Sequence, residues 1–565
     1  MAFQLSPGVN VSEIDLTTIV PSVATSIGAF AGPFAWGPAG EVITISDEVR
    51  LADRFGKPTS TNYEYWFSAA NFLAYTNTLK VVRAVSVATT KNATANGNGL
   101  LIKNDDDWEL NYSTGQGTEG SWSAKYAGSL GNSLKVSICD SVGFSTWRVS
   151  TETGNVNANT YFTTAPSTST YVSNQGGSND EVHVIVIDED GKFTGTKNTV
   201  VETFPFASKA SDAKDDSGNS IYYRNVVATK SKYIRWMDHP AGMTNWGSAA
   251  ANTTFTNLSS NTSVSLSGGD DGTISTANVT SAYDYFSNAD AVDVSLLVSG
   301  PANGTVAGHL ISMAANRKDC VAFVSPEKAD VVDNAGDEAA DVVAFRNTLT
   351  SSSYAVIDSN WKYQYDKYND VYRWIPCNGD VAGLCARTDQ ERDPWFSPGG
   401  LNRGIMKNVI KLAWNPNKTD RDTLYVNGVN PVVSFQGEGT VLFGDKTMQT
   451  KPSAFDRINV RRLFIVLEKA IARAARYSLF EFNDQFTRAQ FVNLVEPYLR
   501  DIQGRRGITD FRVVCDESNN TGEVIDRNEF IGDIYIKPAR SINFIQLNFV
   551  AVRTGVSFDE VVGQF

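Results

Sequence analysis

The sequence predicts an α+β protein of several domains: an α/β core domain, a β-rich outer insertion, and an α+β C-terminal domain that carries terminal strand arms. The chain has 565 residues, and one hydrophobic core rarely grows beyond about 250–300 residues, so about three domains are expected. Its apolar fraction of 42% and charged fraction of 20% are typical of folded globular proteins. Strand and helix patterns alternate before residue 90 and after residue 282, whereas Gly, Ser, Thr and Asn dominate the region between.

Residues 1–20 are predicted to form an N-terminal linking arm. A Pro-Gly pair opens it, no hairpin partner follows nearby, and its apolar residues have strand-like spacing: Val9, Val11, Ile14 and Leu16. Ordering a lone strand costs roughly 1–2 kcal/mol per residue in backbone entropy, against about 0.5–1.5 kcal/mol gained per hydrogen bond. We therefore expect the arm to order only against the sheet of a neighbouring molecule.

The middle α/β domain is predicted from residues 21–90 together with 283–400. Its first part should contain a strand at 42–45, a helix at 47–55, a helix at 63–75 and a strand at 80–87. In the second part a continuous apolar run at 293–298 predicts a buried strand. A helix at 306–317 and a strand at 320–324 complete a βαβ unit, followed by a helix at 329–349 and a strand at 354–358.

Residues 91–282 are predicted to be a β-rich insertion of one or two subdomains. Turn clusters separate short β-prone pieces such as 134–138 and 181–187. A turn-rich composition with few apolar residues suits solvent, so this insertion is expected on the outer surface.

Residues 401–552 are predicted to be the C-terminal domain, and residues 553–565 a second arm. Apolar residues from Val460 to Leu479 recur at three- and four-residue spacing, which indicates an amphipathic helix. A second helix is expected at 484–503, followed by strands at 511–515, 530–536 and 542–552. The last strand alternates apolar and polar side chains, and its candidate arm residues are Ile545, Leu547 and Phe549.

Composition argues against several classes of function. The chain carries 49 basic and 62 acidic side chains, and a net charge of −13 disfavours direct binding to nucleic acid. The apolar stretch at 19–36 contains two prolines and two glycines, so neither an export signal nor a membrane insertion is expected. The five cysteines are odd in number and form no CxxC pair, which predicts buried reduced thiols.

No pattern of catalytic, cofactor or metal-binding residues is found, so the chain is not expected to be an enzyme. Gly439–Thr447 resembles a phosphate loop, but Asp445 precedes Lys446 and breaks the GxxxxGK spacing. Gly268–Gly272 lacks the spaced oxygen ligands of a calcium loop and predicts a tight turn. The three histidines lie in separate segments, which disfavours a histidine-based site.

Two charged segments have competing interpretations. The mixed-charge run Ala386–Trp395 is interpreted as an ordered loop at a domain or subunit contact rather than an active site. Residues 451–512 carry twelve basic and seven acidic side chains, a net charge of +5 in an acidic chain. Three of these basic residues gather at a predicted helix C-terminus: Arg500, Arg505 and Arg506. They either decorate a solvated face or bind an acidic partner.

Several separated motifs together resemble the contractile tail sheath proteins of myovirus-type phages. The first half of the chain contributes Leu5–Asp15, Gly37–Gly40 and Trp122–Ile138. The middle contributes Val381–Gly383, Ala386–Asp389 and Pro394–Gly400, although Cys377-Asn378-Gly379 departs from the family's proline-rich version. The C-terminal part contributes Leu424–Pro431, Gly437–Thr447, Asn459–Phe464, Phe482-Asn483 and Val514–Thr521. Residues 140–265 match no motif of the family.

The resemblance implies a structural subunit that polymerises as a helical tube around a tail tube and contracts by subunit repacking, driving the tube through the host envelope. Its C-terminal domain would face the tube, with Arg500, Arg505 and Arg506 as candidate contacts, and both arms would pair with neighbouring subunits. The implied partners are further copies of the chain, the tail tube protein, and the baseplate and tail terminator proteins. The implied location is the virion, after assembly in the host cytoplasm, and no cofactor is implied.

Two other functions compete with this one. The first is the sheath of a phage-derived contractile injection device of the tailocin type, which would share fold and mechanism. The second is a carbohydrate-active or receptor-binding protein that uses the β-rich middle. That protein would need a groove of aromatic side chains with paired carboxylates, whereas the aromatic residues here are dispersed.

Overall fold

The computed structural model describes residue 20 and residues 23–115, 117–543 and 545–546. The predicted arm residues Val9, Val11, Ile14, Leu16, Leu547 and Phe549 lie outside the described residues. The chain divides into two compact units, one formed by residues 21–473 and the other by Val20 with the residues from 474 onward. Each unit is described by itself.

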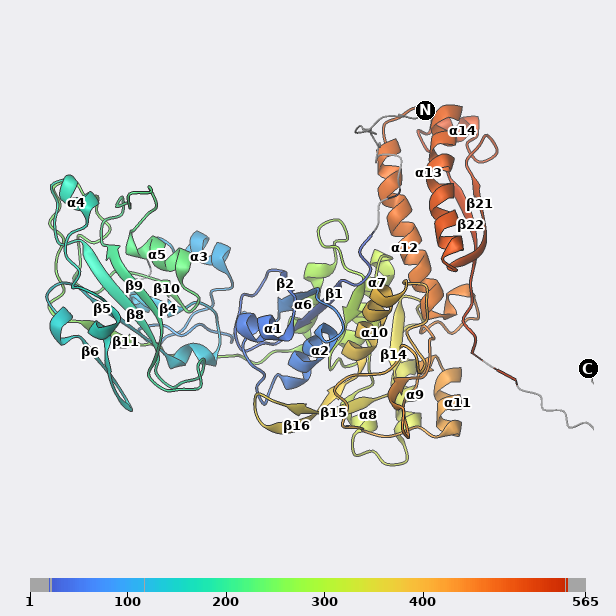
Figure 1. The fold of residues 1–565 in the computed structure, drawn as a ribbon, viewed down its shortest axis with the longest axis horizontal. Helices are drawn as coiled ribbons and strands as arrows, with labels where there is room; N and C mark the ends of the chain where they lie inside the picture. The colour runs from blue at the N-terminus through green and yellow to red at the C-terminus, as the bar shows by residue number, and fades with distance from the viewer. Residues whose placement is uncertain (1–19, 21–22, 116, 544, 547–565) are drawn as a thin grey trace, which may run out of the picture. The chain divides into compact units, whose positions relative to one another are not determined.

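A seven-stranded sheet forms the centre of the first unit, in the order β18-β14-β13-β12-β1-β3-β2 (Figure 1). Neighbouring strands are parallel except for β2, which is antiparallel to β3. The strands are β1 (Gly28–Gly32), β2 (Ile43–Ile45), β3 (Leu79–Arg83), β12 (Leu296–Val298), β13 (Val321–Val324), β14 (Ala355–Asp358) and β18 (Val429–Asn430). The sheet thus draws its last strand from beyond residue 400, the predicted end of the middle domain.

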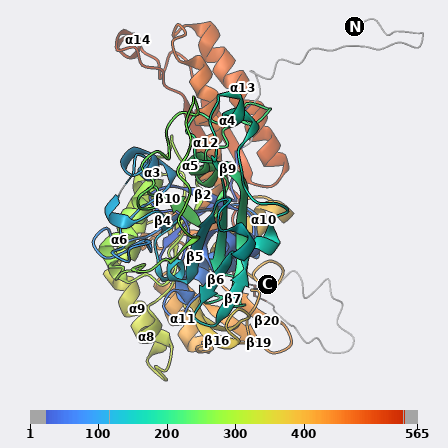
Figure 2. The same cartoon turned by 90° about the vertical axis from the view of Figure 1, so that its left-hand side faces the viewer.

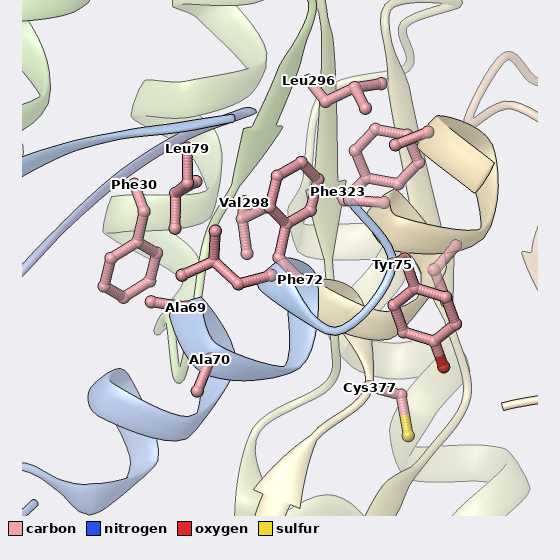
Figure 3. Packing of buried hydrophobic residues seen from close by; sticks show 14 of the residues in the cluster. Phe30, Ala69, Ala70, Phe72, Tyr75, Leu79, Leu296, Val298, Phe323 and Cys377 are labelled. Atoms are coloured by element: carbon pink, nitrogen blue, oxygen red, sulfur yellow. The ribbon is translucent and has the colours of Figure 1, made fainter. Parts of the chain in front are cut away.

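Helices cover both faces of this sheet. α2 (Tyr63–Leu73) and α10 (Asn378–Glu391) pack on one face against Phe30 and Phe323, as Figure 3 shows for the residues around α2. The other face packs against α6 (Thr276–Tyr283), α7 (Gly304–Arg317) and α9 (Glu338–Thr348). Because successive strand residues point to opposite faces, Phe30 joins the first core, whereas Ala29 and Ala31 join the second. Full burial of a Phe side chain contributes about 1.5–3 kcal/mol.

Most secondary-structure predictions for this sheet domain are confirmed within a few residues. The expected helix at 63–75 is α2, and the expected βαβ unit is β12, α7 and β13. The single helix expected at 329–349 is wrong, because the chain forms α8 (Lys328–Val331) and α9 with a turn between them. Asp333 and Gly336 adopt positive φ angles of 59° and 103° in that turn, and such angles cannot continue a right-handed helix.

The insertion folds around a four-stranded antiparallel sheet in the order β11-β5-β8-β9. Figures 1 and 2 show this sheet with α4 (Thr170–Asn174) at one end. Its strands are β5 (Leu134–Cys139), β8 (Glu181–Asp188), β9 (Thr199–Ser208) and β11 (Thr262–Ser265), and the two strands expected at 134–138 and 181–187 are confirmed. Despite its polar composition the insertion has hydrophobic cores of its own, which bury Trp122 and Trp147.

Arg83 joins the insertion to the sheet domain. It ends β3, is almost fully buried, and donates hydrogen bonds to the carbonyl oxygens of Phe34 (2.9 Å), Gly37 (2.8 Å) and Ala127 (2.8 Å). Burial lowers the pKa of this guanidinium to about 10. A buried cation must have its donors satisfied, so these three carbonyl groups fix the path of the chain at the start of the insertion.

The mixed-charge run interpreted as a loop is mostly helical. Residues up to Glu391 belong to α10, and Asp389 is buried against the guanidinium of Arg462. Arg462 lies in α12 (Ile458–Ala475), the amphipathic helix expected from the apolar spacing. The loop prediction is wrong for residues up to Glu391, because they continue α10 and a buried ion pair holds the end of that helix.

The second unit is a helix packed on a two-stranded sheet. α13 (Gln485–Gly504) contacts β21 (Ile508–Val514), which pairs antiparallel with β22 (Asp533–Pro538), and α14 (Gly522–Asp526) lies between the strands in sequence. The helix expected at 484–503 is confirmed. Leu479, expected in the apolar stripe of α12, instead follows the helix and is exposed. The described part of the strand expected at 542–552 is not in a strand, and Ile545 is exposed.

Candidate functional site

The β21–β22 ladder is the first candidate assembly surface. Arg512 pairs with Tyr535 and Val513 with Ile534, and among the described residues neither strand has a second partner along its outer edge. A two-stranded sheet is marginal alone, and an unpaired edge offers backbone N–H and C=O groups to another strand. This ladder can therefore accept extended chain from a neighbouring molecule.

α13 positions the three arginines proposed as tube contacts. Asp484 caps the start of the helix by accepting the N–H of Thr487 (2.8 Å). Near the other end, Arg500 donates to Glu496 (3.3 Å) and Arg505 to Asp501 (3.4 Å). Arg506 follows the helix with a positive φ of 67°. All three side chains are exposed, and exposed pairs of this kind are weak, so they can exchange for another acidic partner.

Some basic residues of the 451–512 segment are not available at the surface. Arg462 is buried against Asp389, and the guanidinium of Arg461 lies 4.2 Å from the ring centroid of Tyr354 and 3.9 Å from that of Phe455. The net charge of this segment therefore overstates its surface charge. Sequence spacing could not distinguish these buried arginines from the exposed ones on α13.

Sequence reasoning missed an exposed apolar surface between α12 and α13. We call it the aromatic turn, and its members are Tyr477, Leu479, Phe480, Phe482 and Phe486. Their side chains are 62% to 106% exposed. The sequence contains a pattern that could have predicted this surface, because five large apolar residues fall within ten positions. Only Leu479 among them is part of the apolar stripe predicted for the helix.

The glycine-rich segments and the cysteines have structural roles in the described residues. Lys446 of the phosphate-loop-like segment donates to the carbonyl oxygen of Tyr425 (2.6 Å). Gly268 and Gly272 adopt positive φ angles of 77° and 70°, as in the expected tight turn. All five cysteines are buried and unpaired, as expected, and burial raises the pKa of Cys320 to about 12. No cluster of three metal-ligating side chains occurs within the part of the chain that the structure describes.

At the carboxyl end of the parallel sheet, the chain's own side chains form a buried polar cluster. Asp358 is the last residue of β14 and accepts hydrogen bonds from the hydroxyl of Ser325 (2.6 Å) and the N–H of Asn360 (3.0 Å). Nearby, the ammonium group of Lys362 lies 2.9 Å from the carboxylate of Asp380, and both residues are fully buried. Burial, the dominant effect, raises the pKa of Asp358 to about 7.

Asp358 gives the fold a predictable pH dependence. The folded state retains this proton up to about pH 7, whereas the unfolded chain releases it near pH 3.8, so unfolding releases a proton in this window. The contribution of Asp358 to stability therefore falls as pH rises from about 4 to about 7. Relative to the unmodified protein, Asp358→Asn should gain on the order of 2–4 kcal/mol between pH 5 and pH 8. Urea unfolding at both pH values measures this, with the exposed Asp526→Asn as control; identical pH dependence in the Asp358→Asn variant and the unmodified protein would contradict the assignment.

No helix among the described residues is long and apolar enough to cross a membrane.

Three family models match the chain. They are described as the phage tail sheath protein central domain over residues 269–448, the phage tail sheath C-terminal domain over residues 450–551, and the tail sheath protein Gp18 domain III N-terminal region over residues 25–84. Together with the α/β sheet domain and the open strand ladder, these matches define a structural protein of contractile phage tails.

Full-length relatives identify the family. The tail sheath protein of Enterobacteria phage T4 is 35% identical over 680 residues, covering 99% of each chain. That of Vibrio phage KVP40 is 34% identical over 705 residues, covering 99% of this chain and 100% of the relative. The chain belongs to the phage tail sheath protein family, and it is a structural subunit of a contractile tail sheath. The resemblance drawn from the sequence motifs is confirmed.

Solved structures share the fold. A sheath tail protein from Listeria innocua has a TM-score of 0.52 at 12% identity, covering 91% of this chain and 96% of that chain. The helical sheath of the anti-feeding prophage in its contracted state has a TM-score of 0.51 at 13% identity, covering 97% and 99%.

Proposed function

We propose that this sheath subunit polymerises around the tail tube by strand addition, and that contraction repacks its rigid domains while the strands keep neighbouring subunits connected. The observation that carries the proposal is the β21–β22 ladder beside α13, whose outer edges have no strand partner within the described part of the chain. A head-to-tail contact of this kind does not close on itself, so it propagates as an open helix. Neither pairing nor repacking uses a catalytic group or a cofactor.

The domains take different roles in this proposal. Residues 1–20 and 553–565 link neighbouring subunits, residues 401–552 face the tube, and residues 91–282 lie on the outside of the sheath. The baseplate and tail terminator proteins would contact the two ends of the polymer. The virion is the proposed location, because the whole-chain relatives are tail sheath proteins of phages. Assembly would take place in the host cytoplasm.

Electron microscopy of the purified protein tests polymerisation. Negative staining of the full chain at micromolar concentration should show striated tubes of uniform width. A preparation that stays as monodisperse monomers over a hundredfold range of concentration would contradict the proposal.

We predict that the α13 arginines contribute to holding the sheath on its tube. Changing Arg500, Arg505 and Arg506 together to Glu should impair assembly on tail tubes but spare polymers made of sheath alone. Each exposed pair contributes only about 0.2–1 kcal/mol, but many copies act together along the tube.

Co-sedimentation with preformed tubes at low salt measures this effect. A matched charge change on the insertion, at the exposed residues Arg148, Lys192 and Lys197, should leave binding unchanged. Normal co-sedimentation of the α13 variant at low salt would refute the contact.

A further inference from the structure

The aromatic turn combines exposure with a fixed backbone. Arg476–Ser478 forms a 3-10 turn after α12, and Asp484 caps α13 on the other side. Between them, the amide of Asn483 donates to the carbonyl oxygen of Glu529 (2.9 Å) and to Oδ1 of Asn520 (3.2 Å). The turn is therefore fastened to the rest of its unit, and its apolar side chains are held in solvent by a defined structure.

Phe480 is the residue of the aromatic turn whose conformation points most clearly to an external partner. Its φ angle is +71°, in the left-handed region that bulky residues rarely adopt, and its side chain is the most exposed of the five. Folding of this unit gains nothing from an exposed ring on a strained backbone, and Gly would fit the same angle without strain. Strained and exposed residues of this kind cluster at sites that act on something outside the fold.

The size of the surface indicates its occupant. Four of the five residues are aromatic, and each aromatic side chain can bury about 150–250 Å², so the aromatic turn offers on the order of 600–1,000 Å². A stable protein interface needs about 800 Å² from each partner, and permanent contacts between identical chains are the more apolar ones. An apolar surface of this size therefore fits a contact with a second copy of this chain.

We propose that the aromatic turn is buried against a second copy of this chain in the sheath, as a contact distinct from the strand ladder. The proposal rests on the proposed function, because it requires a polymer of sheath subunits. The turn supplies apolar adhesion, while the β21–β22 ladder supplies backbone hydrogen bonds. The two surfaces can therefore be disabled separately.

A Phe480→Gly variant tests this contact without threatening the fold. Gly relieves the positive φ angle, so the melting temperature of the monomer should not fall, while the critical concentration for polymerisation should rise at least tenfold. Leu110→Ser, at a similarly exposed apolar residue in the insertion, is the matched control and should polymerise normally. Polymerisation of Phe480→Gly at the unmodified protein's critical concentration would overturn the inference.

A Phe480→Cys variant identifies the occupant. The five native thiols are buried, so an environment-sensitive dye should label the new thiol selectively in the folded protein. Its emission should shift to the blue when the protein polymerises alone. A shift that needs added tail tube protein, or no shift in polymers, would overturn the second-copy assignment. If the unmodified protein does not polymerise, both the proposed function and this inference fail. If the unmodified protein polymerises and Phe480→Gly polymerises equally well, only this inference fails.

Discussion

Deletion of residues 1–19 should give a folded, soluble protein that does not extend into tubes. The segment is predicted to pair with a neighbouring subunit and not with its own fold, so its removal should leave the melting temperature within a few degrees of the unmodified protein. Polymerisation should be lost, because each subunit then lacks the extended segment that we expect to pair with its neighbour's sheet. Thermal unfolding and electron microscopy of the same preparation measure the two effects.

A variant that keeps the length of the arm separates strand pairing from a simple tether. Replacing Val9, Val11, Ile14 and Leu16 with Ser keeps the chain length but removes the apolar side chains, and it should also abolish tubes. Normal tubes from the deletion variant would remove the basis for an arm. Tubes from the Ser variant would contradict a role for these four apolar side chains in assembly.

Lys362→Met should destabilise the fold strongly, because it breaks a fully buried ion pair. The ammonium group of Lys362 lies 2.9 Å from the carboxylate of Asp380, and it also donates to the carbonyl oxygen of Lys407 (3.0 Å). The hydroxyl of Tyr75 donates to the same carboxylate (3.0 Å), so the network ties the end of α2 to β15 (Trp361–Asp366) and α10. Removing the cation leaves a fully buried carboxylate without its counter-charge, which costs about 3–5 kcal/mol.

Chemical denaturation at low protein concentration measures this loss. The double variant Lys362→Met with Asp380→Leu should recover most of the stability, because two apolar side chains carry no desolvation penalty. Lys537→Met removes an exposed pair with Asp510 and is the control that should cause no measurable change. A Lys362→Met protein as stable as the control would show that the buried pair does not hold these elements together.

The periodicity of the sequence predicted several strands and helices of the sheet domain, because elements buried on one or both faces have regularly spaced or continuous apolar residues. Continuous apolar runs such as Leu296–Val298 correspond to parallel strands covered on both sides, and the three- and four-residue spacing around Leu463 corresponds to α12. No periodic pattern in the sequence marks the true end of this domain, which was predicted at residue 400. β18 enters the sheet from beyond it, and only tertiary pairing determines that neighbour.

The roles of side chains whose partners lie far away in the sequence could not be predicted from the sequence. Asp389 lies in a run that was expected to be an ordered loop, and its partner Arg462 stands 73 positions later in the sequence. Arg83 likewise acquires its role from carbonyl groups 44 to 49 positions away. The aromatic turn differs, because its density of apolar residues is visible in the sequence. It was overlooked because Leu479 fits the three- and four-residue spacing of the helix and was therefore counted with the apolar face of α12.

A helical reconstruction of tubes assembled from the purified full-length chain tests the central claim most directly. The account predicts extended density along the outer edge of the β21–β22 ladder, traceable to residues 1–19 or 547–565 of a neighbouring subunit. Tubes in which both edges of the ladder face solvent, with subunits joined only through other surfaces, would contradict strand addition as the basis of assembly.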